Sequence, residues 1–277
     1  MRRLTCPTLA ALLATAAAAP AAPPADPAKV QEAIKKGAEY LQKFAPGGDR
    51  SAGQQAGLAS LVGLALLEAG VKPTDPTLAG IIQGVRVSAF DQTQTYSVAL
   101  AAIFLDRLND PADVPLIQLL GCRLQAGQNL AGGWGYETWA PGPDDAAARA
   151  AVGVKDPALI RPQPLPDPNE PPPAPPKLHP QAAKVYTAVR GGYRVGGGGG
   201  GDNSNTQFAI VGLWVAQRRG VPCGAAFRGI ESRFLRTQSP SDHGWGYSEG
   251  GGASTPSMTC AGWSSSGSGP LREAPRP

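Results

Sequence analysis

The sequence predicts an all-α protein built from repeated pairs of helices, and two observations support that prediction. The tetrapeptide Gly-Trp-Gly-Tyr occurs twice, at residues 133–136 and 244–247. Amphipathic stretches also alternate with stretches in which almost every side chain is apolar or small. Self-similarity of this kind is typical of a repeat architecture, in which each unit buries its apolar face against its neighbours.

Each predicted pair consists of an amphipathic outer helix followed by an apolar inner helix. A helix with one apolar face lies at a surface, and a helix without a polar face is buried on all sides. The predicted outer helices are residues 28–44, 76–89, 111–128 and 225–237. The predicted inner helices are residues 55–69, 96–108, 205–219 and a fourth that begins at 257.

The inner helices align on four small residues, Gly63, Ala102, Gly212 and Gly262. Once residues 139–201 are set aside, the spacing is about 40–50 residues, which suits a two-helix repeat. The excluded segment contains a Pro-rich stretch and a run of consecutive Gly, and neither composition buries enough apolar surface to offset its ordering entropy. We therefore predict a disordered insertion.

Part of this insertion has side chains suited to local packing. Tyr186, Val189 and Tyr193 could dock locally.

The two ends of the chain differ from its body. Arg2 and Arg3 precede an apolar run at 9–19 and a small-residue site, which predicts a secretory signal cleaved after Ala21 and an extracytoplasmic protein. Helical periodicity stops after Gly262, either because the chain ends in a loose tail or because the reading frame has shifted, and the abrupt change favours the second. The predicted division is a signal peptide at 1–21, helix pairs at 22–138, the insertion at 139–201, helix pairs at 202–262 and a disordered or frameshifted tail at 263–277.

Composition restricts the partners. The formal net charge is +4 and the basic residues are scattered, so no nucleic-acid surface is predicted, and no segment is long and apolar enough to span a membrane. Cys122, Cys223 and Cys260 have no metal-ligand spacing. We expect Cys122 and Cys260 to be buried thiols within helices.

The Gln…Gly-x-Trp turns between alternating helices resemble those of the terpenoid cyclase and protein prenyltransferase superfamily. The closest pattern is the squalene-hopene-cyclase-type repeat, also called the prenyltransferase/squalene oxidase repeat. It is carried by residues 125–136, 202–221 and 227–262, and the last two stretches read like secreted bacterial members. The resemblance implies an α/α toroid around a central cavity. With about 3.5 helix pairs visible, we expect an incomplete arc, as in a truncated chain.

The resemblance also assigns roles to the turn residues. In this superfamily the Gln and Trp of the turn clamp neighbouring outer helices together, and we expect a structural role here in preference to ligand contact. The turn-motif residues are Gln128, Trp134, Tyr136, Gln238, Trp245 and Tyr247.

Cyclases of this superfamily protonate an alkene with the central Asp of an Asp-x-Asp-Asp motif. The corresponding residues here are Asp202, Asn203, Ser204 and Asn205, so Ser204 stands where the acid is expected. A serine hydroxyl is far too weak an acid for that step. Asp202 is a weak catalytic candidate, because an Asp before a helix is an ordinary N-cap.

Other site types are not indicated. Protein prenyltransferases bind zinc through Asp, Cys and His, but His179 and His243 have no paired Cys at ligand spacing, so we predict neither a metal nor a cofactor. The candidates for lining a cavity or contacting a ligand are Asn203, Asn205, Phe208 and Trp214.

Three functions follow from these observations. The first is a secreted repeat protein without cyclase activity that binds an apolar small molecule or a protein partner on its concave face. The second is a divergent terpene cyclase, of the isomerase class, or another isoprenoid-acting enzyme. The third is a truncated gene product that folds poorly, because too few repeats leave little buried surface per residue.

Overall fold

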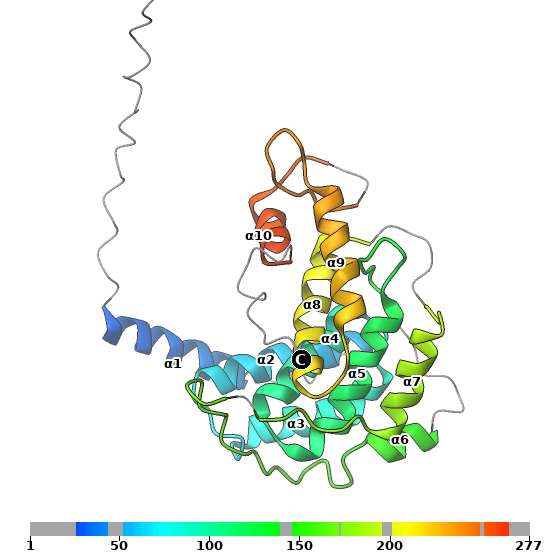
Figure 1. The fold of residues 1–277 in the computed structure, drawn as a ribbon. Helices are drawn as coiled ribbons and strands as arrows, with labels where there is room; N and C mark the ends of the chain where they lie inside the picture. The colour runs from blue at the N-terminus through cyan, green and yellow to red at the C-terminus, as the bar shows by residue number, and fades with distance from the viewer. Residues whose placement is uncertain are drawn as a thin grey trace, which may run out of the picture.

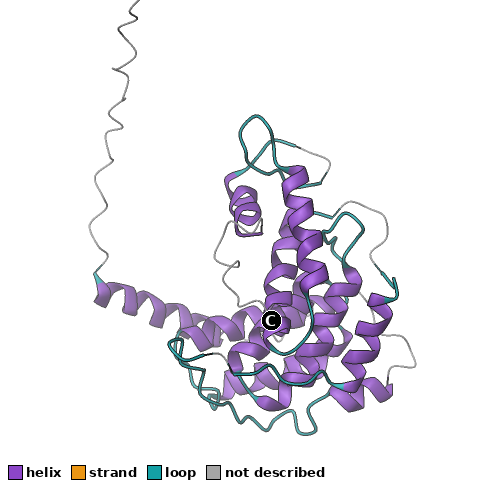
Figure 2. Ribbon diagram, in the orientation of Figure 1, coloured by secondary structure: helices purple, strands orange, loops and turns teal. Residues whose placement is uncertain are grey.

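A computed structural model describes residues 26–43, 52–138, 146–171, 173–195, 201–249 and 252–265, and within these ranges all regular structure is helical (Figures 1 and 2). The all-α prediction is confirmed. The predicted signal peptide lies outside the described residues. The α-helices are α1 (Pro27–Lys43), α2 (Ala52–Glu68), α3 (Pro76–Ser88), α4 (Thr95–Leu108), α5 (Val114–Gly127), α6 (Ala146–Val152), α7 (Pro180–Arg190), α8 (Asn203–Arg218), α9 (Gly224–Thr237) and α10 (Pro256–Ser265), with short 3₁₀ turns η1 (Ala89–Asp91) and η2 (Pro111–Asp113).

The apolar helices pack against one another in chain order. Helix α4 lies between α2 and α8, and α8 also contacts α10. Small residues permit this close packing: a Cβ added to Gly212 would lie 3.2 Å from the Cα of Ala99, and one added to Gly63 would lie 2.5 Å from the ring of Phe104. Gly63 and Gly212 therefore mark contacts between neighbouring inner helices, whereas a Cβ added to Gly262 would meet the ring of Trp245.

The amphipathic helices pack on this inner series. Helix α3 packs on α2, α5 packs on both α4 and α8, and α9 contacts α10. The apolar face of α3 is buried, and the carboxylate of Asp75 caps the helix by accepting hydrogen bonds from the backbone N–H groups of Thr77 and Leu78. The alternation of outer and inner helices matches the sequence pattern except at α5, where residues 116–127 are all buried because α7 also packs on this helix. Closure into a toroid stays a prediction.

Helix α1 is the least integrated of the outer helices. It has no buried residue and extends away from the body of the molecule (Figure 1). Val30 and Ile34, which the sequence places on its apolar face, are more than two-fifths exposed. None of the described helices is both long and apolar enough to cross a bilayer.

The structure differs from the prediction of a disordered insertion over residues 146–171 and 173–195. These residues include α6 and α7, and α7 packs on α5. The reason is an apolar face: Ala182, Val185 and Val189 are buried at helical spacing. Tyr186 is partly buried against the same core, as predicted, whereas Tyr193 is exposed.

The extended part of the insertion is held by hydrogen bonds to outer helices. The guanidinium of Arg86 is fully buried, pairs with Asp110 and Asp113, and donates to the backbone carbonyls of Pro157 and Leu159. The hydrogen bonds that the buried Arg86 guanidinium must make therefore hold a segment without secondary structure in place. Composition does not reveal such contacts.

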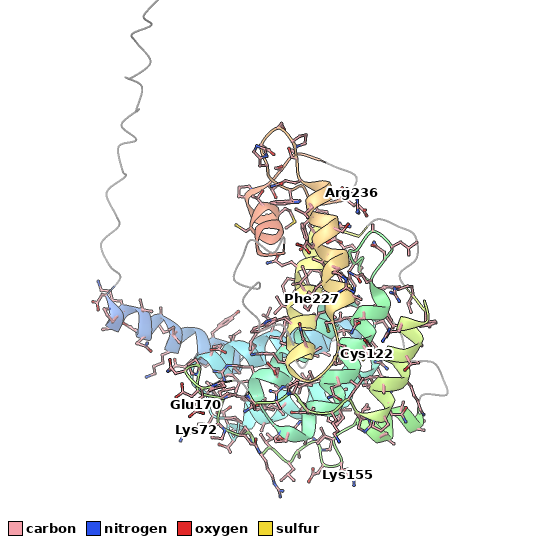
Figure 3. The ribbon with its side chains drawn as sticks, viewed as in Figure 1. Lys72, Cys122, Lys155, Glu170, Phe227 and Arg236 are labelled. Atoms are coloured by element: carbon pink, nitrogen blue, oxygen red, sulfur yellow. The ribbon has the colours of Figure 1, made fainter. Side chains whose placement is uncertain are left out.

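Of the two cysteines predicted to be buried, one is buried and one is exposed. Cys122 is buried inside α5, as expected, and burial raises the pKa of its thiol to about 12 (Figure 3). Cys260 is exposed on α10, contrary to expectation.

Helix α10 continues to Ser265, past the predicted end of periodicity, and residues 266–277 lie outside the described ranges.

Candidate functional site

The first Gly-Trp-Gly-Tyr turn joins the N-termini of two inner helices. The backbone carbonyl of Trp134 accepts a hydrogen bond of 2.9 Å from the N–H of Asp202, before α8. The carbonyl of Tyr136 accepts one of 2.8 Å from the N–H of Thr95, at the start of α4. The Thr95 hydroxyl also donates to the carbonyl of Gly135 at 2.7 Å.

The second turn repeats this geometry one helix pair later. The carbonyl of Trp245 accepts from the N–H of Thr255 at 3.1 Å, and that of Tyr247 accepts from the N–H of Asn203 at 2.8 Å. The Asn203 carboxamide donates to the carbonyl of Gly246 at 2.9 Å, as the Thr95 hydroxyl donates to Gly135. The two copies of the tetrapeptide are therefore structurally equivalent staples.

The Trp and Gln side chains of these turns make structural contacts. Trp134 is fully buried, and its indole N–H donates to the carbonyl of Leu124 at 2.7 Å. Trp245 donates in the same way to Phe234 at 2.9 Å. The Gln128 carboxamide donates to the carbonyl of Ala226 in α9, the next outer helix, at 3.0 Å.

The other members of the turn motif are less deeply placed. Gln238 donates to the carbonyl of His243 within its own turn at 2.8 Å. Tyr136 and Tyr247 are exposed, and their hydroxyl oxygens lie 3.0 Å apart. The structure thus brings the two predicted turns together at one end of the inner helices.

Asp202 is the N-cap of α8. One carboxylate oxygen accepts from the backbone N–H of Asn205 at 2.7 Å, and the other accepts from the Asn205 carboxamide at 2.8 Å. Capping of this kind stabilises a helix by about 0.5–2 kcal/mol relative to Ala. The Asn205 carboxamide oxygen is buried and has no hydrogen-bond partner among the described residues.

Ser204 forms a neutral hydroxyl pair. Its Oγ is hydrogen-bonded to the hydroxyl of Tyr96 on α4. Burial raises the pKa of Tyr96, so this phenol stays protonated over the whole physiological range. The Tyr96 ring also packs against Phe208, with ring centroids 4.6 Å apart. Two weakly acidic hydroxyls therefore lie at the position where the predicted resemblance expects an acid.

Further along the inner helices from the Ser204–Tyr96 pair, several apolar side chains on one side remain partly exposed to solvent. On α4 the accessible positions are Tyr96, Leu100, Ile103 and Arg107, which share a stripe at helical spacing. The most open members are Leu61 of α2, 49% exposed, and Val211 of α8, 38% exposed. We call the following set the inner-helix face: Leu61, Leu64, Leu100, Ile103, Phe208, Val211 and Trp214.

Charged groups close the far end of the inner-helix face. Arg107 of α4 pairs with Glu68 of α2, and Arg218 of α8 pairs with Asp106 of α4. The Arg218 guanidinium also lies 4.0 Å from the centroid of the Trp214 ring, a cation–π contact. An apolar strip thus runs between a hydroxyl end and an ionic end.

The predicted ligand residues separate into two groups. Phe208 and Trp214 lie on the inner-helix face, but Asn203 and Asn205 do not. Asn203 is buried, and its carboxamide oxygen accepts from the guanidinium of Arg233. Tyr96, Leu100 and Ile103 were missed as site residues, although their spacing on an otherwise buried helix was a usable signal.

No metal cluster of three or more His, Cys, Asp or Glu side chains occurs within the described ranges. His179 instead caps α7, its Nδ1 accepting from the N–H of Gln181. Comparison of the chain with family models, curated proteins and solved structures finds no match. The resemblance to terpenoid cyclases therefore stays a prediction.

Proposed function

We propose that this chain is a binding protein that holds an apolar molecule against its inner-helix face. The observation that carries the proposal is the partial exposure of a continuous apolar strip on α2, α4 and α8. Soluble proteins seldom leave such strips open, and those that exist are often binding sites. We extend the proposal to an extracytoplasmic location, which rests on the predicted signal peptide.

Cyclisation is the less favoured alternative. Both carboxylate oxygens of Asp202 accept hydrogen bonds from Asn205. At the position of the expected acid, Ser204 is hydrogen-bonded to Tyr96. An acid strong enough to protonate an alkene must be free to give up its proton in a dry cavity. Incubation with squalene and related polyenes would contradict our proposal if a cyclised product formed.

Binding can be measured with the neutral apolar dye N-phenyl-1-naphthylamine, whose fluorescence rises in an apolar site. We expect saturable binding and displacement by squalene. Val211→Asp places a charge in the middle of the inner-helix face and should weaken dye binding by roughly tenfold or more, because a desolvated unpaired carboxylate costs more than the 1.4 kcal/mol that a tenfold change represents.

The matched control is Leu235→Asp on the outer helix α9, where the side chain is 62% exposed. This variant adds the same charge away from the inner-helix face and should bind dye as the wild type does. Equal loss in both variants, or no loss in Val211→Asp, would show that the dye binds elsewhere and that the proposal is wrong.

A further inference from the structure

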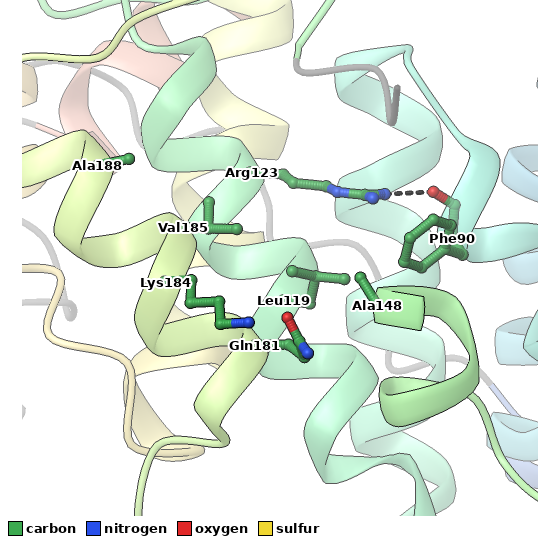
Figure 4. A pocket seen from close by; sticks show the side chains of 8 residues that line it. All are labelled: Phe90, Leu119, Arg123, Ala148, Gln181, Lys184, Val185 and Ala188. Carbon is green, nitrogen blue, oxygen red and sulfur yellow. Dashed lines mark hydrogen bonds between the residues drawn. The ribbon is translucent and has the colours of Figure 1, made fainter. Parts of the chain in front are cut away.

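A second candidate site lies on the opposite, outer side of α5. The folded insertion and α5 form a pocket of about 190 Å³ there, which is partly open to solvent (Figure 4). Its walls come from α5, α6, α7 and η1. The lining residues are Phe90, Leu119, Arg123, Ala148, Gln181, Lys184, Val185 and Ala188.

The size and walls of the cavity suit a small organic body. An apolar protein cavity of about 150 Å³ is large enough to bind benzene. Leu119 and Val185 line the cavity from α5 and α7, and Ala148 lines it from α6, beside Phe90 (Figure 4). A single ring or a short aliphatic chain would fill this space.

The charged groups around the cavity are predominantly basic. Arg123 and Lys184 line it, and none of its lining residues is acidic. Arg123 is only 2% exposed, and its guanidinium donates to the carbonyl of Phe90 and lies 4.3 Å from the centroid of the Phe90 ring (Figure 4). The Arg149 guanidinium lies 4.8 Å from the same ring and pairs with Asp91.

In a pocket with apolar walls, the electric field of basic side chains is strengthened, and the pocket attracts anions. Lys184 reaches the cavity from an exposed position on α7, so its ammonium can meet an entering anion, and the Gln181 carboxamide one turn earlier can donate a hydrogen bond. The pocket thus has an apolar interior and an entrance at which Lys184 supplies a positive charge and Gln181 a hydrogen-bond donor.

We propose that this cavity binds a small organic carboxylate whose apolar body is about the size of one ring. The carboxylate faces Lys184 and Gln181, and the body lies against Leu119 and Val185. The site is separate from the inner-helix face, so the two proposals stand or fall independently.

Benzoate is the probe, and isothermal titration calorimetry of the full chain is the measurement. A ligand of this size at ordinary efficiency binds with a Kd of roughly 1–10 mM. Benzyl alcohol has a similar body without the charge and should bind more weakly. Lys184→Gln should weaken benzoate roughly fivefold to tenfold, because a charge-assisted hydrogen bond is replaced by a neutral one.

Two variants control this test. Lys177→Gln removes an exposed lysine that precedes α7 and does not line the cavity, so benzoate binding should be unchanged. Ala148→Leu fills the cavity and should abolish binding while circular dichroism shows an intact fold. The proposal is overturned if benzoate does not saturate, if benzyl alcohol binds equally well, or if Lys184→Gln and Ala148→Leu bind as the wild type does.

Discussion

At the scale of single residues, Trp134 and Trp214 have opposite environments. The indole of Trp134 is fully buried and donates to the carbonyl of Leu124. The indole of Trp214 is half-buried on the inner-helix face beneath Arg218. The first contact stabilises the turn, and the second leaves an aromatic surface open to a ligand.

Replacing each indole should separate these roles. Trp134→Ala should lower the free energy of unfolding by about 3–5 kcal/mol, the usual cost of removing a buried aromatic side chain. Trp214→Ala should lower it by only about 1 kcal/mol, since part of that ring is already in water. Urea denaturation monitored by circular dichroism gives both values.

The same two variants should respond differently to the dye. We expect Trp214→Ala to weaken binding of N-phenyl-1-naphthylamine and Trp134→Ala, under conditions where it is folded, to bind normally. A large stability loss in Trp214→Ala with unchanged dye binding would assign that residue to the core.

At the scale of elements, Gln118 of α5 fixes α7. Its carboxamide is buried, accepts from the backbone N–H of His179 at 2.7 Å, and donates to the carbonyls of Lys177 at 3.0 Å and Arg219 at 2.6 Å. One side chain therefore joins the start of α7 and the end of α8 to α5.

Gln118→Ala should release α7 without unfolding the inner helices. The lost hydrogen bonds leave three backbone groups without their partner, each at about 1–3 kcal/mol if it remains buried. Hydrogen exchange of the amides of α7 should accelerate, while exchange in α2 and α4 stays slow. Gln207→Ala on α8 is the control, and equal acceleration in both variants would contradict the assigned role of Gln118.

The elements also show what the sequence could predict. The faces of α3 and α9 follow from periodicity because burial alone determines them, and the Trp134 and Trp245 turns follow from repetition. Helix α5 differs, because α7 packs on it and residues 116–127 are all buried. The Pro and Gly around α7 predict disorder, although Ala182, Val185 and Val189 have helical spacing. Its docking depends on a partner surface and on Gln118, which lies about 60 residues away along the chain.

The candidate site was only partly predictable for a similar reason. Phe208 and Trp214 stand out as large apolar residues on an apolar helix. Asn203 resembled a ligand residue, but its partner Arg233 comes from a different helix, and that contact cannot be read from spacing. The cavity beside Arg123 exists only because the insertion folds.

At the scale of the whole molecule, the inner helices form one continuous contact series from α2 to α10. We therefore expect the described body to unfold in a single cooperative transition. The indoles of Trp134, Trp214 and Trp245 sample the turn after α5, the middle of α8 and the turn after α9. Thermal melts followed by tryptophan fluorescence and by circular dichroism should coincide.

Two separated transitions would instead mean that the helix pairs on either side of the insertion unfold independently. Residues 1–43 provide a useful comparison, because α1 has no buried residue. Their deletion should leave the midpoint of the main transition nearly unchanged. A large drop would show that α1 contributes more than its packing indicates.

The placement of α8 beside α5 has a kinetic consequence. About 75 residues separate these neighbours, whereas a direct helical hairpin needs only a short connection, and each doubling of a closed loop costs about 0.6 kcal/mol. If α7 settles on α5 first, the remaining loop to α8 is much shorter. Docking of the insertion would then accelerate the packing of α8, so the folding rate of the helix pairs would depend on a segment outside the repeat.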